Sequence, residues 1–323
     1  MPSSPLVLVT GGAGFIGSHI AETLLKRGAR VRVLDNLTTG SESNVRVLKR
    51  AGGSRLHLVK GDLRNLAAVR RAVRGVRYLF HQGAVPSVVR SVKDPLTTHQ
   101  VNVDGTLNVL LAARDAGVKR VVFASSSSVY GDSPRLPKVE TQPLNPLSPY
   151  AVSKLTGEHY CALFNRLYGL RTVALRYFNV YGPRQDPRSD YAAVIPRFIT
   201  ALLDGRQPIV FGDGRQSRDF TYISDVVRAN LLACRAPARA CGLAYNIAGG
   251  LRISLLELLR QLGRLTGTRP QPRFEPPRPG DVRHSLAALA RARRGLGFRP
   301  GAGLRDGLSR TVRSFADGSR SGG

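Results

Sequence analysis

The feature that most constrains the fold is a run of glycines at fixed spacing near the N-terminus. The segment reads Thr-Gly-Gly-Ala-Gly-Phe-Ile-Gly, in which Gly11, Gly14 and Gly17 follow the pattern Gly-x-x-Gly-x-x-Gly. An apolar run, Leu6–Val9, precedes this loop, and a segment with helical periodicity, Ser18–Arg27, follows it. A glycine loop between a strand and a helix predicts a tight turn, close helix packing and room for a pyrophosphate at the helix N-terminus. The loop therefore predicts a dinucleotide site.

Short apolar runs alternate with helical segments through the first half of the chain. Runs without polar alternation predict parallel strands that are buried on both faces. We expect these strands at Leu6–Val9, Val31–Leu34, Leu56–Val59, Tyr78–Phe80, Val121–Ala124 and Thr172–Leu175. Right-handed crossovers between them predict an α/β fold with a doubly wound parallel sheet of the Rossmann type.

The second half of the chain differs in composition, because proline and glycine interrupt it repeatedly. It predicts a smaller C-terminal mixed α/β lobe for the substrate, with short strands at Ile209–Phe211 and Tyr245–Ile247. We place the dinucleotide-binding domain at residues 1–180 and the substrate lobe at residues 181–323. The tail, residues 317–323, is expected to be disordered.

The amino-acid composition limits the ligands and the cellular compartment that we expect for the chain. Lys and Arg number 49 against 21 Asp and Glu, a net charge of +28, which suits an anionic ligand. The arginines are scattered, which favours compositional drift plus a polyphosphate ligand over nucleic-acid binding. No apolar run approaches the ~20 residues of a membrane span, and the first residues do not resemble a secretory signal. The cysteines, Cys161, Cys234 and Cys241, lack metal-ligand spacing, so we expect no metal and a reducing cytoplasm.

Two acidic residues at strand ends predict how an adenosine would be held. Asp35 closes the second predicted strand, 18 residues after Gly17. A carboxylate there accepts hydrogen bonds from a ribose diol and repels a 2′-phosphate, and no arginine directly follows it, which favours NAD over NADP. The alternative is an aspartate that only stabilises the turn. Asp62, after the third strand, is expected to hold the adenine amino group.

A tyrosine and a lysine four residues apart are the candidate proton-transfer pair. Tyr150 and Lys154 share a face of a helix that begins behind Pro149. An ammonium beside a phenol favours the phenolate, so the sequence predicts that Tyr150 acts as a base near neutral pH. The serine-rich segment Ser125–Ser128 follows a predicted strand at the carboxyl edge of the sheet, where ligands bind. Each motif alone is commonplace; together with the glycine loop they are specific.

Taken together, these motifs resemble the extended short-chain dehydrogenase/reductases that act on nucleotide sugars. The resemblance is strongest to the UDP-glucose and UDP-N-acetylglucosamine 4-epimerases, and it covers nearly the whole chain. It rests on residues 10–19, 80–84, 101–106, 125–131, 148–158, 176–183, 212–222 and 278–285.

The resemblance implies a role for each matching residue. Ser126, Tyr150 and Lys154 are the expected catalytic residues. The cofactor is expected to contact Gly11, Gly14, Phe15, Ile16, Gly17, Asp35, Asn36, Asp62, Leu63, Gln82, Gly83, Ala84, Asn102, Tyr150, Lys154 and Tyr177. The sugar nucleotide is expected to contact Ser126, Tyr150, Asn179, Val194, Ile209, Phe211, Arg218, Arg278 and Ser285.

The activity that the resemblance implies is interconversion of UDP-glucose and UDP-galactose through a 4-keto intermediate, with tightly bound NAD. A small residue at Ser285 implies that UDP-GlcNAc and UDP-GalNAc are also substrates. The alternative for this serine is an N-cap of a helix beginning near Leu286. Related homodimers imply a homodimer here, by analogy.

Other functions share parts of this sequence pattern. Serine at positions 127 and 128, where 4,6-dehydratases need an Asp-Glu pair, argues against dehydration, and the missing carboxylate also argues against a UDP-glucuronate decarboxylase. A UDP-glucuronate 4-epimerase shares the serine-rich strand end, although its relatives usually carry threonine where this chain has Asn179. A non-catalytic relative that binds RNA is suggested by the charge of +28, and the retained Ser126, Tyr150 and Lys154 argue against it.

Overall fold

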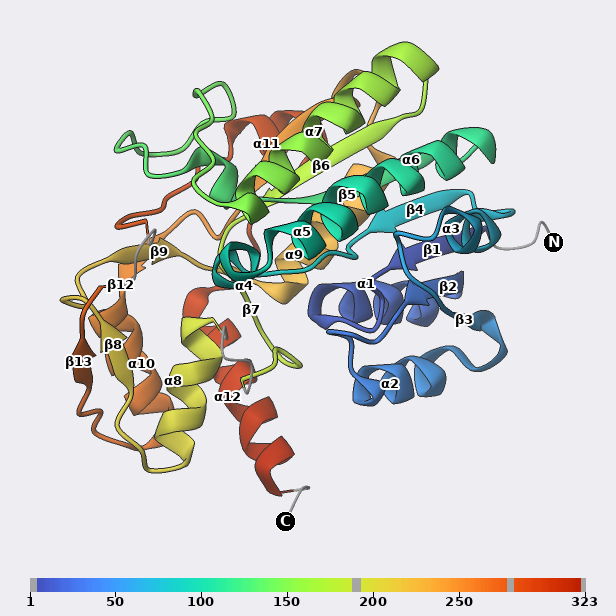
Figure 1. The fold of residues 1–323 in the computed structure, drawn as a ribbon. Coiled ribbons are helices and arrows are strands. Elements are labelled where there is room, and N and C mark those ends of the chain that lie inside the picture. Colours follow the sequence, from blue (N-terminus) through green and yellow to red (C-terminus); the bar gives the residue numbers. More distant parts are fainter. Residues whose placement is uncertain (1–4, 188–192, 278–281, 321–323) are drawn as a thin grey trace.

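The computed structural model describes residues 5–187, 193–277 and 282–320, which form a layered α/β unit and a smaller lobe beside it (Figure 1). Seven parallel strands form the main sheet, in the order β11-β6-β5-β4-β1-β2-β3. The strands are β1 (Leu6–Thr10), β2 (Arg30–Asp35), β3 (Leu56–Lys60), β4 (Tyr78–His81), β5 (Arg120–Ser126), β6 (Thr172–Tyr177) and β11 (Leu243–Ile247). The predicted doubly wound parallel sheet is confirmed.

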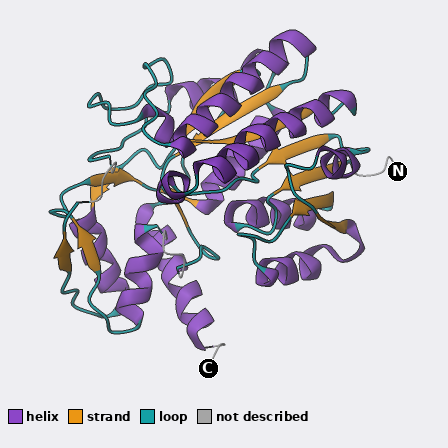
Figure 2. Ribbon diagram, in the orientation of Figure 1, coloured by secondary structure: helices purple, strands orange, loops and turns teal. Residues whose placement is uncertain are grey.

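Helices cover both faces of this sheet (Figure 2), because its central strands are apolar on both sides; every residue of β6 is buried. One face packs against a cluster from α3 (Leu66–Val73), α6 (Gly105–Asp115) and α7 (Pro149–Tyr168). The other face packs against α1 (Phe15–Lys26), α2 (Glu42–Gly52), α9 (Ile223–Arg235) and α11 (Ala290–Leu296). The single-turn elements are η1 (Gly53–Arg55), η3 (Ser127–Tyr130) and η4 (Ala238–Ala240).

The smaller lobe combines three short strand pairs with three helices. The pairs are β7 (Val180–Tyr181) with β10 (Thr221–Tyr222), β9 (Ser217–Asp219) with β12 (Arg252–Ser254), and β8 (Ile209–Phe211) with β13 (Arg273–Glu275). The helices are α8 (Val194–Leu203), α10 (Leu255–Thr266) and α12 (Leu304–Arg320). One apolar cluster runs from α1 and α9 into α8 and α10, so the two units share a core.

Three sequence expectations differ from the structure. The strand expected in the small lobe at 245–247 is the edge strand β11 of the main sheet, so the chain returns to the sheet well after residue 180. The tail expected to be disordered from residue 317 is helical as far as Arg320, because α12 continues there. Helical periodicity over 97–113 predicts one continuous helix, but the structure divides this segment into α5 (Pro95–His99), a π-helical turn η2 (Gln100–Asp104) and α6, with α4 (Val88–Lys93) preceding them.

Within the three described segments, we find no helix with the length and apolar character that a membrane span requires. The same residues contain no group of three or more His, Cys, Asp or Glu side chains placed to hold a metal ion. The three cysteines are all free thiols.

Candidate active site

The glycine loop closes against the end of β4. Gly11 has a φ of +64°, and a Cβ atom there would lie 2.7 Å from the Cα of Gly83, so only glycine fits this turn. A Cβ at Gly17 would collide with the carbonyl oxygen of Gly11, which confirms the predicted close packing of helix on loop. No side chain caps α1 at Gly14, and its first turn carries no acidic residue. The helix N-terminus is therefore suited to an anion such as a pyrophosphate.

The two predicted adenosine-binding carboxylates are both engaged by neighbouring groups. Asp35 Oδ2 accepts a hydrogen bond from the Ala13 N–H (2.9 Å) and Oδ1 from the Leu37 N–H (2.8 Å), so this residue also stabilises the turn. Asp62 accepts from the Arg64 guanidinium and from Asn36 Nδ2 (3.1 Å), and the Arg64 hydrogen bonds lower its pKa to about 2. A carboxylate oxygen has two acceptor sites, so each Asp35 oxygen retains one for a ligand. Asp62 also accepts from the Arg64 N–H (2.9 Å), so its two oxygens receive four hydrogen bonds from the protein and retain no free site.

A buried histidine that the sequence reasoning missed links β1 to α6. His81, at the end of β4, contacts Thr10 Oγ1 through Nδ1 (2.7 Å) and Thr106 Oγ1 through Nε2 (3.0 Å). Burial lowers its pKa to about 3, so the ring is neutral. The Thr106 hydroxyl donates to the Asn102 carbonyl, so we assign the ring proton to Nε2, and Thr10 then donates to Nδ1. The Thr10 oxygen in turn accepts from the Gly83 N–H (3.1 Å).

Asn102 lies in the π-helical turn η2 and connects the loop after β4 to α7. Its Oδ1 accepts from the Val85 N–H (2.8 Å), and its Nδ2 donates to Ser153 Oγ (3.1 Å) on α7. Ser153 Oγ donates to the Tyr150 carbonyl (2.7 Å). A π-turn often marks a functional position, and here it directs one amide side chain between two elements.

Tyr150 and Lys154 face the end of β5, where Ser126 lies. The half-buried Tyr150 side chain lies beside Ser126, whereas Lys154 Nζ donates to the Ala124 carbonyl (2.9 Å) and lies 5.8 Å from the centre of the Tyr150 ring. Burial raises the pKa of Tyr150, and the Ser126 hydrogen bond opposes this rise. Burial lowers the pKa of Lys154 to about 8.

This electrostatic balance corrects the sequence argument. Lysine was expected to lower the pKa of the phenol, but in the protein chain alone Ser126 is the group that lowers it. The physical reason is that the Lys154 ammonium is itself desolvated and bonded to a main-chain oxygen rather than to the phenolic oxygen.

Tyr177 and Gln82 meet at a second residue that the sequence reasoning missed. Asn230 of α9, which is fully buried, contacts the Tyr177 hydroxyl through Nδ2 (2.8 Å) and accepts from Gln82 Nε2 (3.2 Å) through Oδ1. Tyr177 pairs with Ser126 in the register of β5 and β6. The structure thus brings Gln82, Ser126 and Tyr177 to one edge of the sheet, as predicted.

On the small-lobe side, Asn179 and Ser285 touch each other. Asn179 has a φ of +33° and donates from Nδ2 to Ser285 Oγ (3.1 Å) and to the Asp219 carbonyl (2.9 Å). Asp219 is fully buried, accepts from the backbone N–H groups of Gly250 (3.0 Å) and Ala287 (3.1 Å), and has its pKa raised by burial to about 6. The helix expected near Leu286 begins instead at Ala290, with Leu289 as its N-cap, so Ser285 does not cap it.

The remaining predicted substrate residues lie on separate elements of the small lobe. Val194 begins α8, Ile209 and Phe211 lie on β8, and Arg218 lies on β9. Arg218 donates to the carbonyls of Ser217 and Arg283 (3.1 Å each). The position predicted at Arg278 falls outside the described residues.

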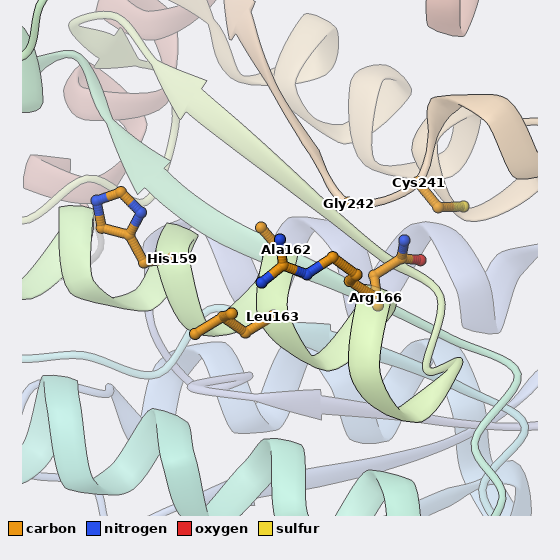
Figure 3. Close-up of a pocket in the computed structure, with 7 residues that line it drawn as sticks. His159, Ala162, Leu163, Arg166, Cys241 and Gly242 are labelled. Atoms are coloured by element: carbon orange, nitrogen blue, oxygen red, sulfur yellow. The ribbon is translucent and has the colours of Figure 1, made fainter.

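A surface pocket on α7 lies apart from these residues (Figure 3). Its lining consists of His159, Ala162, Leu163, Asn165, Arg166, Cys241 and Gly242. It contains none of the predicted site residues, and α7 therefore presents Tyr150 and Lys154 near its N-terminal end and this pocket farther along its length.

Known proteins resemble the chain along nearly its whole length. The family model described as NAD dependent epimerase/dehydratase family matches residues 7–248. The UDP-glucose 4-epimerase of Mycolicibacterium smegmatis is 40% identical over 317 residues, which cover 97% of this chain and 99% of that protein.

Two solved structures extend this similarity to the fold. The UDP-N-acetylglucosamine 4-epimerase from Methanobrevibacter ruminantium, in complex with UDP-N-acetylmuramic acid, has a TM-score of 0.92 and 38% identity, covering 98% of this chain and 99% of that one. The Thermus thermophilus UDP-glucose 4-epimerase, in complex with NAD, has a TM-score of 0.87 and 40% identity, covering 96% and 99%.

Proposed function

The chain belongs to the NAD dependent epimerase/dehydratase family, and from this premise we propose that it is a UDP-hexose 4-epimerase with tightly bound NAD. The observation that carries the proposal is the placement of Tyr150 and Lys154 of α7 at the end of β5, beside Ser126, at the carboxyl edge of the sheet. Serine at 127 and 128 leaves the position without the acid–base pair that dehydration requires. An acid–base group that takes up and returns the same proton is the chemistry of epimerisation.

The glycine loop and its neighbours carry the groups that would hold NAD. The uncapped N-terminus of α1 would receive the pyrophosphate at Gly14, Phe15 and Ile16. Asp35 would accept from the ribose diol, with Asn36, Asp62 and Leu63 beside the adenine. The loop Gln82–Ala84, Asn102 and Tyr177 would line the nicotinamide half. When bound, NAD supplies a hydride acceptor and donor for C4 of the sugar, which passes through a 4-keto form without net oxidation.

The protein's own residues handle the proton. Tyr150 removes the proton of the 4-hydroxyl group, and Ser126, which lowers the pKa of the phenol, shares it. Lys154 has three N–H donors, of which one is held by the Ala124 carbonyl. The other two are free to hold the nicotinamide ribose and to place positive charge beside the reacting groups.

The small lobe supplies the sugar-nucleotide contacts. Asn179 and Ser285, which touch each other, would face the hexose, while Val194, Ile209 and Phe211 would hold the uridine. Arg218 and Arg278 would pair with the diphosphate, because guanidinium groups give paired donors to phosphate oxygens. The small side chain of Ser285 leaves room near C2 of the sugar, so we expect both plain and N-acetylated hexoses to be turned over.

A homodimer is the proposed assembly. Large apolar side chains are exposed on α4, α5 and the first turn of α7, and they include Val89 (40%), Val92 (64%), Leu96 (66%) and Val152 (48%). Exposed apolar side chains gathered on neighbouring helices are typical of an interface, and α4 and α5 both pack against α7. Residence in the cytoplasm stays a prediction of the sequence.

The test is direct incubation of the purified protein with UDP-glucose, UDP-N-acetylglucosamine and UDP-glucuronate, with products resolved by NMR. We expect UDP-galactose and UDP-N-acetylgalactosamine to form without added cofactor, and the absorbance of the protein to show bound NAD. Conversion of UDP-glucuronate alone would replace this proposal with the UDP-glucuronate 4-epimerase. Binding of RNA without any epimerisation would indicate a non-catalytic relative.

A further inference from the structure

A buried ion pair lies directly behind the candidate catalytic groups. Glu158 and Arg176 have side chains that are only 7% and 4% exposed. Arg176 Nε donates to Glu158 Oε1 (2.9 Å), and Arg176 Nη2 donates to Oε2 (2.7 Å), so the contact is bidentate. The guanidinium also donates from Nη1 to the Tyr130 hydroxyl (2.8 Å), and Ser125 donates to Glu158 Oε1. The pair is thus satisfied on both sides by buried partners.

The residues of this buried cluster lie next to the candidate site residues along the same helix or strand. On α7, Tyr150, Lys154 and Glu158 follow one another at intervals of four residues and share a face. Arg176 directly precedes Tyr177 on β6, and Ser125 directly precedes Ser126 on β5. The two ions therefore join the three elements whose ends carry the candidate proton-transfer groups.

The Glu158–Arg176 contact fixes both the distance and the relative rotation of α7 and β6. The Lys154–Ala124 hydrogen bond and the approach of Gly157 to the Phe123 ring, where a Cβ atom would clash, hold α7 close to β5. Neither of these contacts reaches β6. The bidentate Glu158–Arg176 ion pair, here called the fork, does reach β6. Its two parallel hydrogen bonds restrict the rotation of α7 against β6, which a single hydrogen bond does not do. A buried ion pair stabilises a fold little more than apolar residues of the same volume, so its distinctive contribution is geometric.

We propose that Glu158 and Arg176 are positioning residues that hold Tyr150 within hydrogen-bond reach of Ser126. The inference rests on the proposed function. Because Ser126 is the group that favours the ionised phenol in the chain alone, a shift of α7 against β5 and β6 would reduce the fraction of Tyr150 that is ionised as well as misplace it. A misplacement of about 1 Å costs about 100-fold in rate.

The test compares two single variants, a double variant and a matched control, all as NAD-bound protein. Glu158→Gln and Arg176→Lys break the fork. Glu158→Leu combined with Arg176→Met removes it without leaving a buried charge. Thr172→Val is the control, because buried Thr172 also links β6 to α7, by donating to the Cys161 carbonyl (2.6 Å), but from the opposite end of β6 and three residues farther along α7 than Glu158.

We expect kcat for UDP-glucose to fall about 10- to 100-fold in the three fork variants, with KM within about threefold. The rise of kcat with pH should move to higher pH, because the phenol loses the bond that favours its ionised form. The Thr172→Val control should keep the wild-type pH profile, even if its melting temperature falls.

A readout independent of turnover separates this inference from the proposed function. The titration of Tyr150 can be followed by NMR of ¹³C-labelled tyrosine and assigned with Tyr150→Phe. A Tyr150 pKa raised in the fork variants and unchanged in Thr172→Val supports positioning, even if the natural substrate proves to be another sugar nucleotide. Wild-type kcat and Tyr150 titration in the folded Glu158→Leu, Arg176→Met double variant would overturn it, as would equal effects in the Thr172→Val control.

Discussion

Acid should destabilise this protein in part through the buried His81 ring. The ring is fully buried between Thr10 and Thr106, and burial lowers its pKa from 6.5 to about 3. In the unfolded chain the same ring binds a proton near pH 6.5. Stability is therefore present in full above pH 6.5 and is lost as the pH falls toward 3, because only the unfolded chain gains the proton over that range.

The size of the effect follows from the two pKa values. Between pH 7 and pH 5 the unfolded chain takes up nearly one proton that the folded chain does not, which costs about 2 kcal/mol. His19, whose pKa is lowered by burial to about 4, adds a similar loss. His81→Gln keeps an N–H for Thr106 but cannot titrate. This substitution should lower the free energy of unfolding by about 1–3 kcal/mol at pH 7, because the Thr10 hydroxyl loses its hydrogen-bond acceptor.

The assay is urea unfolding at pH 7 and pH 5, with saturating NAD in every sample. From pH 7 to pH 5, the free energy of unfolding of the wild type should fall by about 2 kcal/mol more than that of His81→Gln. The contribution of His19 is the same in both proteins and cancels in the comparison. Equal losses in the two proteins would refute the reasoning, since they would mean that His81 takes up a proton in the folded state as readily as in the unfolded one.

Four further outcomes are expected. Tyr150→Phe should lower kcat by at least ~100-fold in steady-state assays while UDP-sugar binding by calorimetry changes little; near wild-type turnover would contradict its role. Apo-protein should recover activity with NAD and poorly with NADP, because of Asp35, and equal recovery would mean that this carboxylate does not select. Ser285→Tyr should abolish turnover of UDP-N-acetylglucosamine and spare UDP-galactose, whereas equal loss of both would show that Ser285 does not wall the pocket. Nucleic-acid binding, measured by filter retention, should be weak and should fall steeply with salt; sequence-selective binding at physiological salt would show that the +28 charge has a partner.

Some of the site is determined by residues that are neighbours in the sequence. Gly11 and Gly17 are predictable because a tight turn and a close helix approach each depend on a few adjacent residues. The shared face of Tyr150 and Lys154 follows from helical periodicity alone. The parallel sheet follows from the alternation of apolar runs with helices, because strands buried on both faces cannot tolerate polar alternation.

Other features were decided only when distant segments met. His81 reaches Thr10 across 71 residues and Thr106 across 25, and Glu158 meets Arg176 across 18; a single sequence carries no signal for such pairings among so many buried polar residues. The strand β11 joined the main sheet because its partner β6 offered an open edge, which is a property of the assembled sheet.

The direction of the Tyr150 pKa was likewise decided by tertiary structure. The sequence places a lysine one turn away, which favours the phenolate, but burial raises the pKa of Tyr150, and Lys154 donates to the Ala124 carbonyl rather than to the phenolic oxygen. Spacing along a helix is local and can be read from the sequence. Desolvation is the sum of contacts from every element packed around a group, so it exists only in the folded protein.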